Sequence, residues 1–372
     1  MKKKALILYS WILVSVIAQV VLYLAIDKLY LGSRSNLAET VKVVNVDSIG
    51  KNEEVEEAPE TSIALPANVS NVKISPDGSY ISYLLDKKLY IVDVVSRETK
   101  KTIDNYFVNG NNTQNKVEAN ITSVQWIPGR NALMYGLSSI PGNPGKVQMF
   151  TYDVETGNEH VGVTFTEYYV PRGGELTDIV ISPLTQVYYA KIKVNQTQER
   201  LFRVNLMDEM SPSITLNTNA VTRIGYYSED LLYDDGSGKL FVKSAFKNPT
   251  QTQIGFNFAL LNVIGADQGG KDVVYLGQVN EENKVEKIYY GIHGTDVTTW
   301  QSIAVAKPLP REEILIKQGG ATYGIDREGG NIYDLQSGSI VAVKGKFVDV
   351  VNDHIAYMDN NQLKFKPIKK KE

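Results

Sequence analysis

The sequence predicts an all-β protein, a six- or seven-bladed β-propeller preceded by one transmembrane helix. Three features indicate this fold class: an uncharged apolar run at residues 5–26, alternation of apolar and polar residues from Ile63 onward, and a strand pattern that recurs along the chain. Repeats of roughly 40–50 residues built from short strands are typical of propellers. A single four-stranded blade cannot cover both of its faces, so it packs against a neighbouring blade.

Residues 5–26 predict a helix that spans the membrane. These 22 residues carry no charge, and as a helix they would extend about 33 Å, enough to cross a bilayer core. Because the sequence MKKK stands in front of them, we expect residues 1–4 to be a cytoplasmic stub. The rest of this single-pass cell-membrane protein would then be extracytoplasmic. A cleaved signal peptide is the alternative, since Val16 and Ala18 form a small-x-small site, but apolar sequence continues well beyond it.

Residues 27–62 predict an acidic, largely disordered linker. Six acidic residues stand against a single lysine between Asp47 and Glu60, and large apolar side chains are scarce there. Such a stretch buries too little surface to offset the entropy of ordering. An acidic strip that docks a basic partner or cations is the alternative interpretation. Residues 63–368 are the predicted extracytoplasmic propeller, and residues 369–372 form a basic tail.

Composition excludes several classes of function. The chain has a formal net charge of −3, and beyond its first four residues acidic side chains outnumber basic ones. This balance argues against nucleic acid as a partner. The chain contains no cysteine, which excludes disulfides, thiolate metal sites and lipid anchoring through a cysteine. A short basic start and the absence of cysteine lead us to expect a bacterial envelope protein.

Three segments share one plan: a strand, a turn that contains proline, a second strand and a third strand. Their prolines, Pro76, Pro128 and Pro183, lie 52 and 55 residues apart. A weaker copy begins near Thr222, and the later half of the plan returns near residues 321–338. These repeats predict blades at residues 66–110, 118–165, 174–215, 220–262, 270–310 and 312–345. The segment 347–368 forms the last strands and is expected to close the ring with a strand around residues 63–65.

The turn Ser75-Pro76-Asp77-Gly78 is interpreted as a structural device and not as a site. Proline removes a donor from the strand ladder, and glycine accepts the positive φ of a tight turn. The stretch VKISPDGSYISYLLDKKLYIVDV that contains it resembles a blade of the TolB-like and WD-repeat-like propellers, including the propeller of prolyl oligopeptidase-type proteins. The motif is complete only at Val72–Tyr83, and the chain lacks a hydrolase-sized region besides the propeller. The resemblance implies a fold and no single activity.

The sequence holds no recognisable catalytic or metal-binding constellation. Its three histidines, His160, His293 and His354, lie far apart without metal-ligand spacing, and there is no Gly-x-Ser-x-Gly elbow. We therefore expect no catalytic residue, no metal and no cofactor. Acid pairs at residues 234–235 and at 267 with 272 offer Ca²⁺ ligands as an alternative to plain turns. The segment GTDVTTW at 294–300 is interpreted as a strand-end turn, because it lacks the Gly and Asp of a sialidase Asp-box.

The predicted function is that of a non-catalytic binding module for a protein or a cell-envelope polymer. Propeller faces present loops from every blade, and loops carry recognition. The candidate contact segments are residues 104–118, 138–146, 164–175 and 263–272, and the candidate contact residues in them are Tyr106, Phe107, Tyr168, Tyr169 and Arg172. Packing at a blade edge is the alternative role for these aromatic side chains. An enzyme that acts on glycans or peptides at the channel mouth, and a sensor that relays through a membrane partner, remain as other functions. A central site lined by carboxylates, arginine or histidine would favour the enzyme.

Overall fold

The computed structural model describes Gln19 and most of the chain from Thr61 onward. The described ranges are 61–107, 116–182, 187–205, 207–218, 220–228, 230–234, 239–243, 250–252, 258–265 and 270–368. The chain divides into two units, Met1–Ala58 and Pro59–Glu372, and the strands all belong to the second. Within the described ranges, no helix is long and apolar enough to cross a membrane. The predicted transmembrane segment 5–26 lies outside those ranges apart from Gln19.

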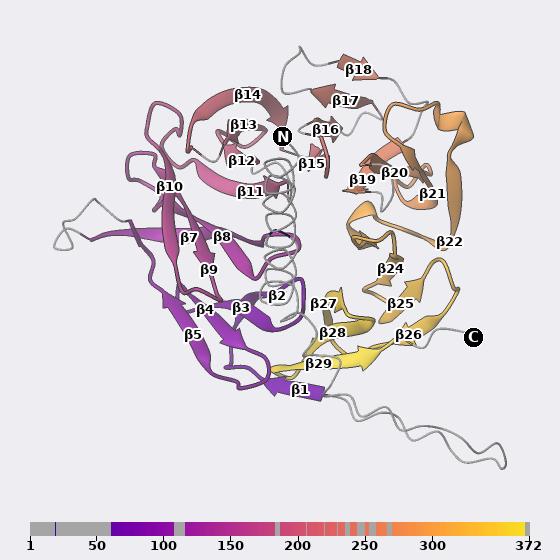
Figure 1. Ribbon diagram of the computed structural model, residues 1–372, viewed down its shortest axis with the longest axis horizontal. Helices are drawn as coiled ribbons and strands as arrows, with labels where there is room; N and C mark the ends of the chain where they lie inside the picture. The colour runs from indigo at the N-terminus through magenta and orange to yellow at the C-terminus, as the bar shows by residue number, and fades with distance from the viewer. Residues whose placement is uncertain are drawn as a thin grey trace, which may run out of the picture. The chain divides into compact units, whose positions relative to one another are not determined.

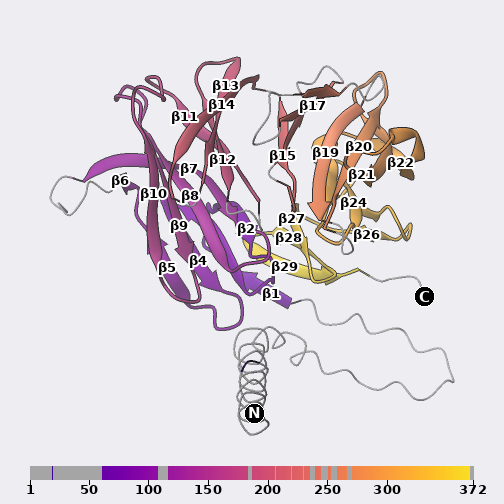
Figure 2. The same ribbon diagram turned by 45° about the horizontal axis from the view of Figure 1, so that its top comes forward.

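The described strands form seven antiparallel sheets arranged around a central axis (Figure 1). Figure 2 shows the same sheets tilted toward the viewer, standing side by side around that axis. Each sheet is one blade of a propeller. The prediction of an all-β propeller is therefore confirmed, and the upper of the two predicted blade numbers is correct.

The first four blades follow one another along the chain. Blade 1 consists of β2 (Ser70–Ile74), β3 (Tyr80–Leu85), β4 (Lys88–Asp93) and β5 (Thr99–Ile103). Blade 2 consists of β7 (Val117–Trp126), β8 (Ala132–Ser139), β9 (Val147–Asp153) and β10 (Glu159–Phe165), and β6 (Tyr106–Phe107) pairs with β7. Blade 3 consists of β11 (Glu175–Ile181), β12 (Tyr188–Lys193), β13 (Gln198–Val204) and β14 (Met210–Asn217). Blade 4 consists of β15 (Val221–Ile224), β16 (Leu231–Asp234), β17 (Leu240–Lys243) and β18 (Thr250–Thr252).

The last three blades include the ring closure. Blade 5 consists of β19 (Phe258–Gly265), β20 (Asp272–Val279), β21 (Val285–Ile292) and β22 (Gln301–Leu309), with η3 (Val297–Thr299) before β22. Blade 6 follows η4 (Arg311–Glu313) and consists of β23 (Ile314–Ile316), β24 (Thr322–Asp326), β25 (Asn331–Asp334) and β26 (Ile340–Ala342). Blade 7 consists of β27 (Lys346–Val351), β28 (His354–Asp359), β29 (Gln362–Pro367) and, from the start of the domain, β1 (Thr61–Ala64).

Two predicted blade boundaries are wrong. Tyr106–Phe107 were expected to lie in blade 1, but β6 pairs with β7 of blade 2. Residues 258–262 were expected to end blade 4, but β19 pairs with β20 and opens blade 5. The outer strand of blade 4 is instead the short β18, which pairs with β17. The sequence marks this boundary with no Ser-Pro turn, so periodicity alone could not assign the strand to the correct sheet. In the same region, the predicted contact segment 263–272 was expected to be a loop, but Val263–Gly265 lie in β19.

The hydrophobic core lies between blades. Seven clusters of buried residues are described, and each joins side chains of two adjacent blades around the complete ring. Period-two alternation sends one set of side chains to each face of a sheet, so each blade contributes to two clusters. The ring is closed by β1, whose Ile63 pairs with Leu363 of β29. The predicted closure is thus confirmed.

The predicted turn device of blade 1 also ties neighbouring blades together. The Asp77 carboxylate accepts hydrogen bonds from the Ser75 hydroxyl at 2.7 Å and from the Ser79 N–H at 2.9 Å. It also accepts one from the Asn131 amide of blade 2 at 2.7 Å. The Asn352 amide of blade 7 donates to the Asp77 backbone oxygen at 2.8 Å. One turn therefore links blades 7, 1 and 2.

Candidate binding site

The first strand of each blade lies at the inner edge of its sheet (Figure 1). Five of these strands, β2, β7, β11, β19 and β27, shift register against their neighbours through a bulge or irregularity. A bulge re-aims nearby side chains. In Asp178, Asn262 and Asp349, which follow such a shift, the side-chain oxygen accepts the N–H of the next residue at 2.7 to 2.9 Å. These short-range hydrogen bonds therefore hold the three polar side chains in place on the inner strands of their blades.

These inner strands bring charges from several blades together. We call Lys73, Gln125, Asp178, Arg223, Lys317 and Asp349 the axial cluster. Lys73 donates to Gln125 at 3.0 Å, and Lys317 forms an ion pair with Asp349 at 3.0 Å. Burial lowers the pKa of Lys73, and Asp178 and Asp349 partly oppose that change. Those two carboxylates belong to blades 3 and 7, so charges on two other blades influence the pKa of Lys73 in blade 1.

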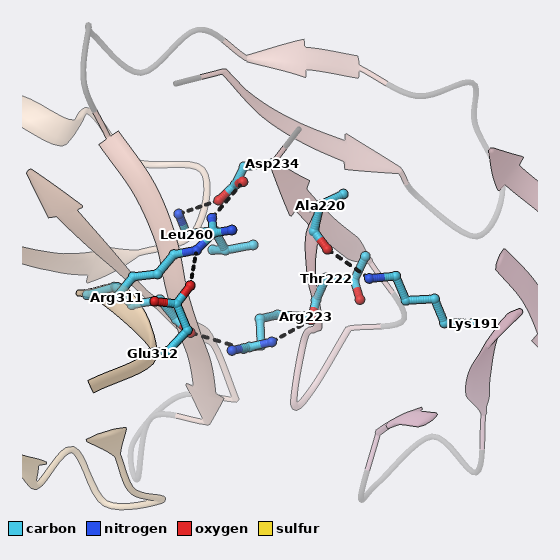
Figure 3. Close-up of polar contacts among 9 residues, drawn as sticks. Lys191, Ala220, Thr222, Arg223, Asp234, Leu260, Arg311 and Glu312 are labelled. Atoms are coloured by element: carbon cyan, nitrogen blue, oxygen red, sulfur yellow. Dashed lines mark hydrogen bonds and ion pairs between the residues drawn. The ribbon is translucent and has the colours of Figure 1, made fainter. Parts of the chain in front are cut away.

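Arg223 occupies the blade 4 side of the axial cluster. Its guanidinium donates to the backbone oxygens of Leu261 at 3.0 Å and Thr222 at 2.8 Å (Figure 3). Burial lowers its pKa, while Asp178 and Asp234 act in the opposite direction. An arginine retains its proton under ordinary conditions, so this side chain is a fixed positive charge that holds blade 4 to blade 5.

Further buried charges connect blades 3, 4 and 5. Asp234 accepts the Leu260 N–H at 2.6 Å and pairs with Arg311 at 3.3 Å (Figure 3). Lys191 donates to the Ala220 backbone oxygen at 2.8 Å. Asp234 was a candidate Ca²⁺ ligand, but its two oxygens serve these contacts. Among the described residues, no group of three potential ligands could hold a metal ion.

A cavity of about 490 Å³ lies between blades 5 and 6. That volume falls in the range of small-molecule sites. Strands β19 to β21 supply one wall, the segment from Thr295 to Gln301 supplies the rim, and the turn before β24 supplies the opposite wall. The lining residues are Ile264, Gly265, Val273, Tyr275, Tyr290, Gly291, Ile292, Thr295, Thr299, Trp300, Gln301, Gly319 and Gly320.

Two tyrosines are the large side chains of the wall. Tyr275 on β20 and Tyr290 on β21 are directly opposite in register, and their rings stack with centroids 5.2 Å apart. The Tyr290 hydroxyl donates to Gln301. The Trp300 indole contacts Gly291 of β21. Its Nε1 donates a hydrogen bond to the Thr295 hydroxyl at 3.0 Å. The rim is therefore held in place by its own hydrogen bonds.

The Tyr275 hydroxyl differs from its neighbours. Only 3% of the residue is exposed, and among the described residues the hydroxyl has no hydrogen-bond partner. It reaches Gly320, where a β-carbon would come within 3.0 Å of the oxygen. Burial is the main cause that raises the pKa of Tyr275 to about 12, and the neighbouring Tyr290 adds to this effect. The phenol therefore stays protonated at neutral pH and can donate to a ligand.

The cavity is neutral. None of its lining residues carries a side chain that is charged near pH 7. Its polar groups are hydroxyls and one amide, from Thr295, Thr299, Gln301 and the two tyrosines. Such a site can bind and orient a ligand, but it lacks a group whose pKa suits general acid–base catalysis.

The residues predicted as contacts do not share one environment, although the rings of Tyr168 and Tyr169 meet edge-on with centroids 4.7 Å apart. Tyr168 is 81% exposed and Arg172 is exposed, while Tyr169 packs edge-on against Phe202. Tyr106 is half-buried. Phe107 is only 4% exposed and belongs to the cluster between blades 1 and 2, which is the packing alternative for that side chain.

Sequence reasoning did not identify the cavity. The segment 294–300 was predicted to be a strand-end turn, and the structure places it between β21 and β22, as expected. The paired tyrosines of adjacent strands and the Gly319-Gly320 dipeptide were the available signals. They could not be combined, because the Gly319-Gly320 turn of blade 6 meets Tyr275 and Tyr290 of blade 5 only after the two blades pack together.

No protein-family model matches this chain, and no curated protein sequence matches it. Among solved structures, it is similar to the WD40 domain of SCAP from fission yeast, with 12% identity, a TM-score of 0.46 and coverage of 82% of this chain and 85% of that chain. It is also similar to an oligogalacturonate lyase in complex with manganese, with 11% identity, a TM-score of 0.51 and coverage of 84% and 99%. At these identities the likeness concerns the fold alone. The described strands form a seven-bladed β-propeller.

Proposed function

We propose that this chain is a membrane-tethered, extracytoplasmic binding module that retains a protein or cell-envelope polymer without changing it chemically. The observation that carries the proposal is the neutral cavity between blades 5 and 6, at which the Tyr275 hydroxyl has no partner among the described residues. The uncharged run 5–26 behind MKKK supports the tether. The acidic balance of the remaining chain supports a partner other than nucleic acid.

The lining of the cavity supports binding without chemistry. General acid–base catalysis needs a group that exchanges protons near the working pH. Tyr275, with its pKa raised to about 12, keeps its proton there. The hydroxyls of Thr295 and Thr299 lie near neither a histidine nor a carboxylate in the lining, so no base activates them as nucleophiles.

Photo-crosslinking in intact cells tests this function. A photoreactive residue replaces Ile292, a lining residue that is 36% exposed, and captured molecules are identified by mass spectrometry. We expect capture of an intact ligand. Thr299→Trp fills the cavity and should abolish capture, whereas Thr298→Trp, at the neighbouring exposed residue outside the lining, should preserve it. Capture that is indifferent to Thr299→Trp would exclude the cavity as the binding site.

The axial cluster favours a second candidate, an envelope enzyme that acts on glycans or peptides. Burial lowers the pKa of Lys73, and a perturbed lysine beside carboxylates is typical of catalytic sites. If this function holds, the full chain releases soluble fragments from isolated envelope polymer. Lys73→Met should stop that release, while Lys87→Met, in an exposed turn, should not. Failure of the wild-type chain to release fragments would exclude this candidate.

A further inference from the structure

We infer that the cavity between blades 5 and 6 binds a neutral saccharide unit of a glycan chain, with the Tyr275 hydroxyl as the group that recognises it. This inference rests on the proposed binding function and adds the chemical class of the ligand. Three features of the cavity support this inference. They are the Tyr275 hydroxyl without a protein partner among the described residues, the uncharged lining, and the backbone groups that are already hydrogen-bonded within the protein.

The hydroxyl of Tyr275 is a polar group at the cavity that has no partner among the described residues. Water or a ligand that enters the cavity can supply the missing hydrogen bond. Only 3% of Tyr275 is exposed, and its hydroxyl oxygen borders the cavity beside Gly320. A ligand oxygen placed there would satisfy it.

The charge of the lining selects a neutral ligand. A carboxylate or phosphate that entered the cavity would lose hydration without meeting a lysine, arginine or histidine. An ammonium group would likewise meet no carboxylate. The hydroxyls of Thr295, Thr299 and Tyr290 already donate within the protein, so they offer acceptor lone pairs to a ligand. The Tyr275 hydroxyl offers a donor. The natural complement of these groups is a molecule rich in hydroxyls.

Backbone N–H and C=O groups around the cavity already form hydrogen bonds within the protein, which argues against a peptide as the ligand. An extended peptide is recognised mainly through backbone hydrogen bonds at an open strand edge. Here Gly320 donates its N–H to Lys317 at 2.9 Å, and its oxygen accepts from Thr322 and Gln336. Gly291 is paired within the ladder of β20 and β21. The polar groups left for a ligand therefore belong to side chains.

The tyrosine pair supplies the apolar part of the contact. A saccharide ring has one face of C–H groups and a rim of hydroxyls, so it matches an aromatic wall next to hydroxyl side chains. Tyr275 and Tyr290 are held parallel by their register and stacking, and Tyr290 is anchored by its bond to Gln301. The wall is thus rigid before any ligand arrives, which reduces the entropy cost of binding.

Calorimetry with the full chain tests the inference. The probes are neutral tetrasaccharides (cellotetraose, maltotetraose and the N-acetylglucosamine tetramer), an oligouronate tetramer as the anionic control, and an acetylated, amidated tetra-alanine as the peptide control. We expect at least one neutral tetrasaccharide to bind, and the anionic and peptide controls not to bind. Tyr275→Phe, which keeps the ring and removes only the hydroxyl, should weaken binding about three- to tenfold.

Matched variants separate recognition from stability. Tyr289→Phe removes a hydroxyl that bonds to Gln278 on the opposite face of blade 5, and it should leave saccharide affinity unchanged. Thr299→Trp should abolish binding, and Thr298→Trp should not. Thermal melting of each variant establishes that it is folded.

The outcomes are distinct. Neutral binding that responds to Tyr275→Phe and Thr299→Trp supports both the ligand class and the binding function. Binding of only the uronate or the peptide, lost in Thr299→Trp, overturns the saccharide class and leaves the binding function standing. Neutral binding that is indifferent to Thr299→Trp overturns the site. If no probe binds and photo-crosslinking at Ile292 captures nothing, both proposals fail.

Discussion

At the scale of single residues, Asp77 links three neighbouring blades of the described ring. Its carboxylate closes its own turn and holds Asn131, and its backbone oxygen holds Asn352. Gly78, with a φ of 79°, allows the turn to close. The sequence predicted the turn from Ser-Pro-Asp-Gly. It could not predict the two asparagines, which come from blades 2 and 7.

Asp77 also makes stability depend on pH. Partial burial raises the pKa of its carboxyl group, but hydrogen bonds from Ser79, Asn131 and Ser75 outweigh burial and lower it. A depressed pKa stabilises the fold above the ordinary carboxyl pKa, and this contribution is lost as the pH falls through the folded value. At about pH 7, Asp77→Asn should cost about 1 kcal/mol of the free energy of unfolding.

Urea unfolding of the wild type and Asp77→Asn checks this prediction. The difference between the two should shrink as the pH is lowered below about 4, because the protonated aspartate then resembles the amide. A difference that stays constant over this range would show that the charge of Asp77 contributes nothing.

At the scale of elements, β1 determines whether the ring is closed. Ile63 is 3% exposed and lies opposite Leu363, which is fully buried. Ala64, the next residue of the same strand, is exposed. The strand thus places one side chain in the core and the other in water, as period-two alternation requires.

Substitution of these two neighbours tests the closure. Ile63→Asp buries an unpaired carboxylate and should lower the free energy of unfolding by about 3 kcal/mol or more. Ala64→Asp should change it by no more than about 0.5 kcal/mol. Urea denaturation followed by circular dichroism measures both. Equal effects of the two variants would mean that β1 is not packed as described.

The strands also show where sequence reasoning works at this scale. Blades 1 to 3 were assigned from their proline-containing turns, and their predicted inner strands coincide with β2, β7 and β11. Blades 4 and 5 were divided wrongly, since β18 is only three residues long and β19 follows no such turn. Hydrogen-bonded pairing with neighbouring strands, and not the local sequence pattern, decides to which blade β18 and β19 belong.

At the scale of the molecule, the unit Pro59–Glu372 contains the complete described ring. Because β1 begins at Thr61, we expect a chain shortened by residues 1–30 to yield a soluble, folded monomer. Size-exclusion chromatography and the β-sheet signal in circular dichroism check this expectation. Aggregation with loss of that signal would contradict it.

The proposed topology is tested on whole cells. Protease added to spheroplasts should remove the propeller if residues 5–26 anchor it outside the cytoplasmic membrane. A cytoplasmic marker protein serves as the control for lysis. A propeller that remains intact until detergent is added would contradict the extracytoplasmic location.

The sequence by itself determined the architecture: alternating residues and recurrent turns are local properties, and together they specify a ring of antiparallel blades. It also determined the absence of disulfides and the slightly acidic charge balance of the chain. Only the tertiary structure decided where a ligand can bind. Tyr275 and Trp300 belong to blade 5 and Gly320 to the turn before β24 of blade 6. Packing of blade 5 against blade 6 brings Gly320 to the Tyr275 hydroxyl and completes the cavity.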